Sequence, residues 1–260
     1  MKIVVLCKYV PNAISERKFV DGDHTTDRVG VDGLLSELDE YAVEEAVKIK
    51  EAGDATVTVL TVGPPQATDA VRKALQMGAD AGVHIIDDSI HGSDALATSL
   101  IIAKALEKVG EYDMVMAGMA STDGEMGVVP AMVAERLGLP HVGYLGNLEV
   151  GDGIVRGRRD GDAAIEHVEA PLPAVVGVTD QINDPRYPSF KGIMAAKKKP
   201  VQTWSLDDLG VSAEQVGLSA AWTSVAEVAA RPPRSHGEVV TDEGDGGVKL
   251  VEFLTSKKFV

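Results

Sequence analysis

The first half of the chain repeats a short apolar run followed by a segment with apolar residues at helical spacing. The runs are rich in β-branched residues and end at turn residues, which predicts buried strands over 3–7, 56–62, 83–86 and 114–117. The spaced segments predict helices over 36–52, 68–77, 93–109 and 130–137. Strands that alternate with helices need crossover connections, so we expect an α/β fold with a doubly wound, mostly parallel sheet.

Several residues mark the ends of these helices. Ser36 and Asp39 fit a capping box at the start of the first helix, and Ser93 is placed to cap the third. Gly53 follows the first helix and suits a left-handed stop. Before the first helix, the polar segment 11–35 contains three glycines, which predicts an irregular loop or a hairpin.

The pattern changes after residue 143. Short segments over 144–150, 154–159, 163–170 and 174–178 are separated by turn residues, which predicts antiparallel strands added to the sheet. In the loop 180–199 that follows, two prolines break regular structure, and a short helix is expected over 193–197. Composition alone makes this loop a surface connection, with Phe190 packed on the core and lysines 197–199 in solvent; the alternative is a docking element.

Beyond residue 200 the pattern loosens. We expect a short helix within 204–217, an irregular acidic segment over 231–247, and an amphipathic helix over 248–259. That last helix needs either its own domain or a partner to cover its apolar face. The chain is therefore divided into an α/β domain over 1–200, with the antiparallel insert 144–178 and the loop 180–199, and a C-terminal extension over 201–260.

Charge and composition narrow the possible partners. The formal net charge of −15 argues against general nucleic-acid binding, which depends on Lys and Arg. No window holds about 18 continuous apolar residues, so no membrane span is expected, and the apolar N-terminus is interpreted as a strand rather than a signal peptide. The single cysteine, Cys7, excludes a disulfide framework and favours a reducing, cytoplasmic location.

Ligands of an open parallel sheet bind at the carboxyl ends of its strands. Three such ends carry suitable residues, namely Cys7-Lys8, Gly63-Pro64 and the loop 118–127. The loop leads into a helix start, where free amides favour an anion, and its glycines and hydroxyl groups suit a phosphate. Neither G-x-G-x-x-G after the first strand nor a P-loop motif occurs, so the usual nucleotide fingerprints do not apply.

Catalytic machinery is hard to find in the sequence. The six histidines lack metal-binding spacing, and we predict no catalytic residue and no metal site. His84 is interpreted as a hydrogen-bonded core histidine and Cys7 as an inert buried thiol. Arg158, Arg159 and Asp160 are interpreted as a surface ion pair of small energetic value.

Several blocks of residues are shared with one known family. They are Leu6-Cys7-Lys8, Ala42-Val43-Glu44-Glu45-Ala46, Arg72-Lys73-Ala74-Leu75, Leu172-Pro173-Ala174-Val175-Val176, residues 183–187 (NDPRY) and residues 192–199 (GIMAAKKK). In this order, and over essentially the whole chain, they resemble the β (small) subunit of electron transfer flavoprotein. The Ser-Thr-Asp-Gly loop and residues 188–192 look closest to actinobacterial members.

The resemblance implies an adenine nucleotide α-hydrolase-like fold and a heterodimer. In that heterodimer an α subunit holds the redox FAD, and the β subunit binds a structural AMP and contacts α through its C-terminal extension. The family accepts electrons from acyl-CoA dehydrogenases of fatty acid β-oxidation and related donors, and passes them to a membrane quinone oxidoreductase of the respiratory chain. The resemblance therefore implies an electron-transfer protein rather than an enzyme.

By position, the resemblance assigns AMP binding to segments at the predicted strand ends and at the start of the first helix. These residues are Leu6, Ser36, Glu37, Leu38, Asp39, Val62, Gly63, Gly118, Met119, Ala120, Ser121, Thr122, Asp123, Gly124, Glu125, Met126 and Gly127. Glu125 would repel a phosphate unless its side chain faces away or contacts the ribose hydroxyl groups.

The resemblance also implies three contact regions. Asn12 and Ala13 fall where the family's β subunit approaches the flavin. Asp160 falls where an acidic residue meets the mobile flavin domain of the α subunit. The donor dehydrogenase would dock on residues of the loop 180–199, with Phe190 as the apolar anchor; this set is Arg186, Tyr187, Phe190, Ile193 and Met194.

Two alternatives remain open. A bifurcating type of β subunit holds a second FAD in place of AMP and oxidises NADH. An ATP-binding domain like the universal stress proteins shares the nucleotide-binding architecture, but this alternative leaves the NDPRY block, the antiparallel insert and the C-terminal extension unexplained.

Overall fold

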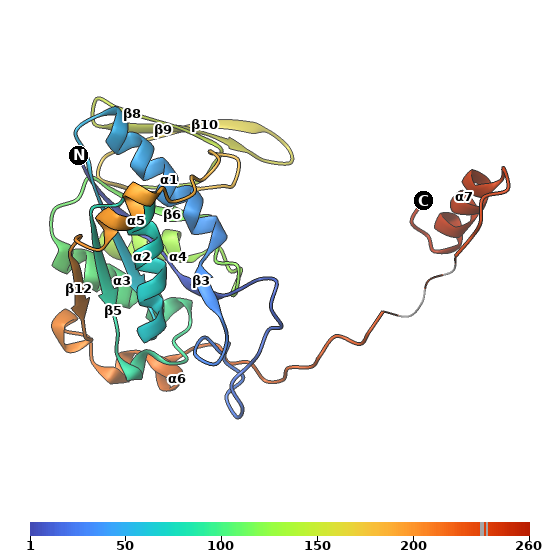
Figure 1. Ribbon diagram of the computed structural model, residues 1–260, viewed down its shortest axis with the longest axis horizontal. Helices are drawn as coiled ribbons and strands as arrows, with labels where there is room; N and C mark the ends of the chain where they lie inside the picture. The colour runs from blue at the N-terminus through green and yellow to red at the C-terminus, as the bar shows by residue number, and fades with distance from the viewer. Residues whose placement is uncertain (235–236, 238) are drawn as a thin grey trace. The chain divides into compact units, whose positions relative to one another are not determined.

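A seven-stranded parallel sheet forms the centre of the larger of two compact units, Met1–Ala226 and Glu227–Val260. The computed structural model describes residues 1–234, 237 and 239–260. The sheet order is β12-β5-β4-β1-β6-β11-β7, and every pairing between these neighbours is parallel. The doubly wound α/β fold predicted from the sequence is confirmed (Figure 1).

The strands of the main sheet match the predicted runs and add three that the sequence pattern placed elsewhere. They are β1 (Lys2–Leu6), β4 (Thr56–Val62), β5 (Ala81–Ile85), β6 (Met114–Gly118), β7 (His141–Leu145), β11 (Ala174–Val178) and β12 (Val201–Trp204). The longer helices are α1 (Glu37–Ala52), α2 (Thr68–Met77), α3 (Ala95–Val109) and α4 (Val129–Leu137). Short 3₁₀ turns, η1 (Pro65–Ala67) and η2 (Asp88–Ile90), precede α2 and α3.

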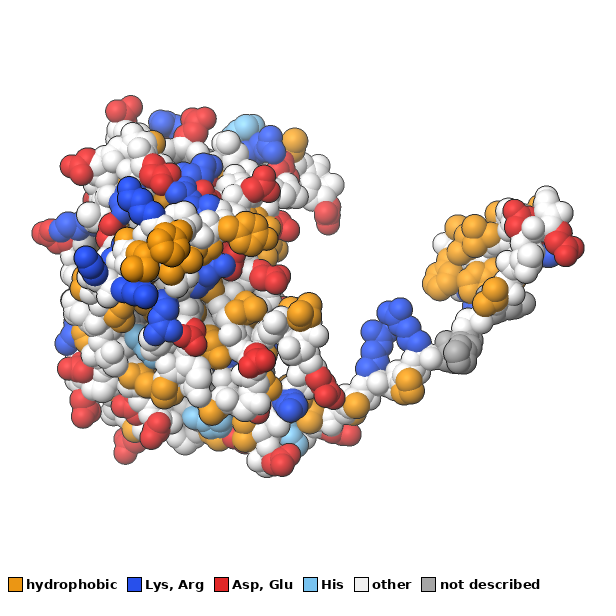
Figure 2. Space-filling model, viewed as in Figure 1, with side chains coloured by type: hydrophobic (Ala, Val, Ile, Leu, Met, Phe, Trp, Pro, Cys, Tyr) orange, Lys and Arg blue, Asp and Glu red, His pale blue; other side chains and the backbone are white. Residues whose placement is uncertain are grey.

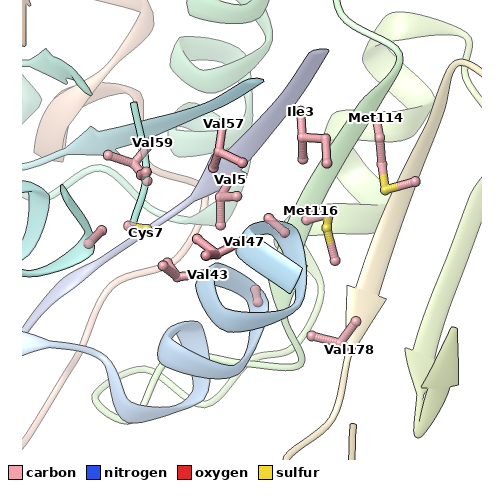
Figure 3. Packing of buried hydrophobic residues seen from close by; sticks show 14 of the residues in the cluster. Ile3, Val5, Cys7, Val43, Val47, Val57, Val59, Met114, Met116 and Val178 are labelled. Atoms are coloured by element: carbon pink, nitrogen blue, oxygen red, sulfur yellow. The ribbon is translucent and has the colours of Figure 1, made fainter. Parts of the chain in front are cut away.

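Helices cover both faces of this sheet. Side chains alternate along a strand, so neighbouring residues of β1 enter different cores. Val5 packs with Val43 and Val47 of α1 in one cluster, which Figure 3 shows between the helix and the strands. Val4 packs with Ile101 of α3 in the other cluster. Burial on both faces explains why these strands read as continuous apolar runs.

The antiparallel insert is smaller than the sequence pattern suggested. It comprises β8 (Asn147–Gly151), β9 (Ile154–Asp160) and β10 (Ile165–Pro171), paired in the order β10-β9-β8. The prediction that 174–178 is an antiparallel addition is wrong, because β11 pairs in parallel with β6 and β7. All five residues of β11 are buried, as is typical of a central parallel strand. Turn residues before a strand mark its start but carry no information about its direction.

The same region contains a second correction. The predicted strand 144–150 is divided between β7, a strand of the main sheet, and β8 of the insert. Tyr144 has a positive φ of 62° at the end of β7, so the chain turns there before Gly146. An apolar pattern that continues across the turn hides this change of sheet.

Three of the predicted helix ends differ in the structure. Ser36 precedes α1 but makes no side-chain capping bond, so the expected capping box does not form. Asp94, not Ser93, caps α3 by accepting a bond from the Ala97 amide at 3.0 Å. Gly53 has an extended φ of −153°, so α1 ends without a left-handed residue.

The chain continues past the predicted domain boundary at residue 200 within the main sheet. β12 pairs in parallel with β5, and two 3₁₀ turns, η3 (Asp207–Leu209) and η4 (Ala213–Gln215), follow it. The predicted helix within 204–217 is therefore wrong; Gly210, in the left-handed region, ends η3 after one turn. A one-turn helix, α6 (Gly217–Ala220), comes next.

The smaller unit contains one helix, α7 (Gly246–Ser256), within two residues of the predicted start. All of α7 is described, and its own unit buries none of its residues. Val248, Leu250 and Phe253 are among its exposed apolar side chains. The irregular segment 231–247 includes His236, which lies outside the described residues.

Candidate functional site

The strand order marks the carboxyl ends of β1 and β6 as a candidate ligand site. From β1 the chain winds outward through β4 and β5, and then crosses back to β6 on the other side of β1. At such a switch point the loops at the carboxyl ends diverge, and ligands bind in the crevice between them. Lys8 after β1 and the loop 118–127 after β6 both lie at this crevice.

The start of α1 connects the two strand ends. Asp39 accepts a hydrogen bond from the Lys8 amide at 2.8 Å, and the Ser36 amide donates to the Lys8 carbonyl at 2.9 Å. The Ser36 hydroxyl accepts a bond from the Thr122 amide at 3.4 Å. Both side chains predicted to cap α1 therefore bond to the neighbouring strand ends instead, which explains why the capping box is missing.

Gly118 allows a close approach at the end of β6. A Cβ atom at this position would lie 2.5 Å from the Leu38 carbonyl oxygen, so any larger residue would push the start of α1 away. The segments 36–39 and 118–127, which the sequence assigned to one site, are therefore brought together.

A buried carboxylate organises the loop after β6. The Asp123 side chain is 0% exposed and accepts bonds from Lys8 Nζ at 2.8 Å and Arg28 Nε at 3.0 Å. Burial raises the pKa of Asp123, but the charges of Lys8 and Arg28 outweigh it and hold that pKa well below its usual range. Sequence reasoning missed Arg28, since nothing in its polar neighbourhood signals a partner 95 positions away.

The pKa of Asp39 is raised, in contrast to that of Asp123. Burial raises the pKa of Asp39 to about 7, against the effect of the Lys8 and Gly118 amides, which donate hydrogen bonds to the carboxylate. Asp39 as a whole residue is 7% exposed. The site therefore contains a carboxyl group that changes its charge near neutral pH.

His84 and Cys7 are buried, as the sequence predicted. His84 is buried on β5, where Nε2 lies 3.1 Å from the Gly63 carbonyl oxygen and Nδ1 lies 3.3 Å from the Thr68 hydroxyl. Burial raises the pKa of the Cys7 thiol, so Cys7 stays protonated and inert. Glu125 is exposed, with a positive φ of 54°.

Comparison with known proteins identifies the family at this point. The family model described as "Electron transfer flavoprotein domain" matches residues 23–209, which is more than half of the chain. The chain belongs to the electron transfer flavoprotein family. The resemblance found in the sequence is confirmed, and family membership implies that the chain works in electron transfer, with an α subunit and a flavin in its complex.

Relatives of the electron transfer flavoprotein family match over nearly the full length. The chain is 50% identical to "Electron transfer flavoprotein subunit beta" of Mycobacterium leprae and 49% identical to that of Mycobacterium tuberculosis, with 99% of each chain covered in both cases. It is 36% identical to "Caffeyl-CoA reductase-Etf complex subunit CarD" of Acetobacterium woodii, with 93% of this chain and 92% of the relative covered. The predicted similarity to actinobacterial members of the family is therefore confirmed.

The loop 180–199 exposes apolar side chains at the surface of the larger unit. Ser189 caps α5 (Phe190–Ala196) by accepting a bond from the Gly192 amide at 3.1 Å. Phe190 is 80% exposed and Tyr187 is 93% exposed, so the prediction that Phe190 packs on the core is wrong. Hydrophobic side chains gather over α5, with Lys and Arg side chains around them (Figure 2).

Arg186 anchors this loop to α1. Its guanidinium donates to the two carboxylate oxygens of Glu44 at 2.7 and 2.9 Å, and to Glu51 at 2.6 Å. Asn183 adds a bond to the Tyr41 carbonyl at 3.1 Å. The sequence assigned Arg186 to a partner; within this chain its guanidinium is already bonded.

One of the three loop lysines is also bonded internally. Lys199 Nζ donates to the Leu75 carbonyl at 2.8 Å, so the prediction that all three lysines are solvated is wrong for this residue. Gly192 meets the end of α2, where a Cβ atom would lie 2.4 Å from the Gln76 carbonyl oxygen. These contacts hold α5 and its exposed apolar side chains in one position.

The other predicted contact residues lie on the antiparallel insert and after β2. Asp160, at the end of β9, pairs with Arg158 at 3.1 Å, and Arg159 pairs with Glu166 at 2.8 Å, as expected of surface ion pairs. Asn12 follows the hairpin strand β2 (Tyr9–Pro11) and accepts a bond from the Ile14 amide at 3.2 Å. Ala13 beside it is exposed.

The described residues show neither a metal site nor a membrane span. No group of three or more His, Cys, Asp and Glu side chains among them is arranged to hold a metal ion. Likewise, no helix in the described part of the chain is long and apolar enough to cross a bilayer.

Proposed function

We propose that the chain is the β subunit of a heterodimeric electron transfer flavoprotein with AMP at the crevice between β1 and β6. Donor dehydrogenases, including acyl-CoA dehydrogenases, dock on the loop 180–199. An FAD held mainly by the α subunit would supply the redox chemistry between these donors and a membrane quinone oxidoreductase. The observation that supports this most is the similarity to β subunits over 99% of the chain.

The residues at the crevice fit an adenine mononucleotide. Lys8 supplies positive charge beside the loop 118–127, and Ser121 adds a hydroxyl group 3.2 Å from Lys8 Nζ. Gly118 lets the start of α1 approach the end of β6, so the segments 36–39 and 118–127 border the same place. Glu125, which would oppose a phosphate, is exposed to solvent. Leu6, Val62 and Gly63 then line the side nearer β1 and β4.

The chain's own role in electron transfer is to bind and position. The flavin supplies the redox chemistry when bound. Asn12 and Ala13 lie on an exposed turn after β2, which suits contact with the flavin, and Asp160 on the insert suits contact with the flavin domain of the α subunit. The loop 180–199 holds the donor, since Arg186 and Asn183 fix its base and leave Phe190 exposed.

A second function is favoured by one relative. The chain is 36% identical to a subunit of a caffeyl-CoA reductase-Etf complex, so a bifurcating type with a second FAD is the competing proposal. These two proposals are distinguished by co-expressing the chain with its α subunit and monitoring the flavin absorbance. We expect reduction by acyl-CoA with its dehydrogenase and none by NADH alone. Reduction by NADH without a dehydrogenase would contradict the first proposal and support the second.

Replacing Phe190 tests the docking loop. We expect Phe190→Ala to lower the kcat/KM of flavin reduction by acyl-CoA dehydrogenase about 30-fold, because losing a buried aromatic anchor costs about 2 kcal/mol. Phe190→Leu keeps an apolar anchor and should stay within about threefold of wild type. Reduction by dithionite needs no docking and should not change in either variant. An unchanged kcat/KM for Phe190→Ala would refute the anchor.

Truncation after Ala226 tests the smaller unit. Because both hydrophobic clusters consist of residues of the larger unit, the shortened chain should keep the thermal unfolding temperature of that unit. The exposed apolar residues of α7 need a partner, so we expect the Kd for the α subunit to rise about 30-fold or more. Titration of the full-length chain and of the shortened chain with the α subunit, followed by size-exclusion chromatography, measures the two Kd values. A truncated chain that binds α with wild-type affinity would show that α7 serves another purpose.

A further inference from the structure

The segment between β2 and β3 (Gly33–Leu35) is tied to the loop 118–127 by two arginines. This segment, residues 12–32, is called the excursion here. Arg17 donates to the Asp123 carbonyl at 3.1 Å and also to the Thr122 carbonyl. Arg28 Nε donates to the Asp123 carboxylate at 3.0 Å. The partners lie about one hundred positions apart in sequence, so these bonds join two separate parts of the chain.

Apart from these two arginines, few contacts hold the excursion against the rest of the larger unit. All of residues 12–32 are described, and none of them is buried. A small hairpin within it pairs Phe19 with Thr26, and Asp23 pairs with the half-exposed His91 at 2.7 Å. A segment without a buried apolar side chain gains little from the hydrophobic effect, so polar bonds decide where it lies.

The bond between Arg28 and Asp123 is the strongest of these ties. The Asp123 side chain is fully buried, and the Arg28 side chain is 28% exposed. A bond inside the protein is less screened than one at the surface, and a buried carboxylate that loses a cation is left poorly compensated. The exposed pair of Asp23 and His91 is screened by water and contributes less.

The same bonds fix the loop that borders the proposed nucleotide. Between β6 and α4 this loop has no regular structure, and residues 124–126 are exposed. Its internal bonds are local, as between the Glu125 amide and the Ser121 carbonyl at 3.0 Å, so they do not fix the loop against the rest of the chain. A loop that is already held in its binding conformation loses less entropy when a ligand binds.

We propose that Arg28, assisted by Arg17, is a positioning residue that holds the excursion closed against the loop 118–127 and so slows the release of the bound adenine mononucleotide. This inference rests on the proposed nucleotide site. Arg28 acts through Asp123 and the loop, and the nucleotide leaves when the tie between the excursion and the loop opens.

The test uses the full-length heterodimer loaded with radiolabelled AMP and chased with unlabelled AMP. We expect Arg28→Gln to release AMP at least about 10-fold faster than wild type. Arg28→Lys keeps the charge but loses the forked geometry, so its release rate should lie between the two. Arg72→Gln is the matched control, because Arg72 pairs with Asp69 on the exposed surface of α2.

Hydrogen exchange of the same heterodimers tests the tie itself. Arg28→Gln should raise amide exchange in residues 13–31 and 119–127 and leave the strands of the main sheet unchanged. Thermal unfolding confirms that each variant is folded. If wild type binds AMP and Arg28→Gln releases it no faster than Arg72→Gln, the positioning role fails and the nucleotide site stands. A wild type that retains no AMP refutes the nucleotide site, and with it the release role, while unchanged exchange in Arg28→Gln refutes the tie.

Discussion

The Arg186→Ala variant is expected to unfold with about 2 to 3 kcal/mol less free energy than wild type. Arg186 bonds both carboxylate oxygens of Glu44, which is 5% exposed, so its loss leaves a buried charge without its cation. Removing one partner of a buried pair costs about 3 to 5 kcal/mol, and the partial exposure of Arg186 reduces this. Denaturant unfolding monitored by circular dichroism measures the difference.

Two further variants show whether Glu44 is the cause. Arg186→Ala combined with Glu44→Gln removes the uncompensated charge and should recover part of the lost free energy. Arg72→Ala removes an exposed pair and should change the free energy of unfolding by about 0.5 kcal/mol or less. A loss of that small size in Arg186→Ala would contradict a buried anchor beneath the docking loop.

The free energy of unfolding should depend on pH through Asp39. The folded-state pKa is about 7 and the reference value is 3.8, so the folded state holds the proton more tightly. Below about pH 4 the group is protonated in both states and adds no pH dependence. Between about pH 4 and pH 7 the unfolded state ionises first, so wild type should lose about 1.4 kcal/mol per pH unit relative to Asp39→Asn.

The measurement compares wild type and Asp39→Asn by denaturant unfolding at several pH values. The asparagine cannot ionise and keeps an oxygen acceptor for the Lys8 amide, so the variant serves as the reference for this group. Above about pH 7 the difference should become constant. A difference that stays flat from pH 4 to pH 7 would show that the carboxyl group titrates at an ordinary pKa.

The core of the fold follows from local patterns, because burial on two faces and helical spacing are properties of neighbouring residues. This is why β1, β4, β5 and β6 and the four longer helices were predicted close to their observed bounds. Strand direction is not a local property, so β11 was misassigned although its apolar run was recognised. β12 was missed because it is an edge strand with exposed side chains, and its four residues lack an apolar pattern.

The candidate site, like the fold, could be predicted from the sequence only in part. Strand ends and glycine loops are visible in sequence, which marked the loop 118–127. The family resemblance added the segment 36–39, which the structure brings against that loop. The sequence does not show which partner a polar side chain bonds, because any nearby amide can satisfy its hydrogen-bonding groups. Asp39 was therefore interpreted as a capping residue, although it bonds to the Lys8 amide. The structure brings distant segments together and so shows the bonds of Arg17 and Arg28 and the anchor between Arg186 and Glu44.

The central claim is that this β subunit holds AMP between β1 and β6 while its α partner holds the FAD. The direct measurement is the cofactor content of the co-expressed heterodimer, released by acid denaturation and quantified by chromatography against AMP and FAD standards. The account predicts about one AMP and about one FAD per heterodimer. About two FAD without AMP would contradict it.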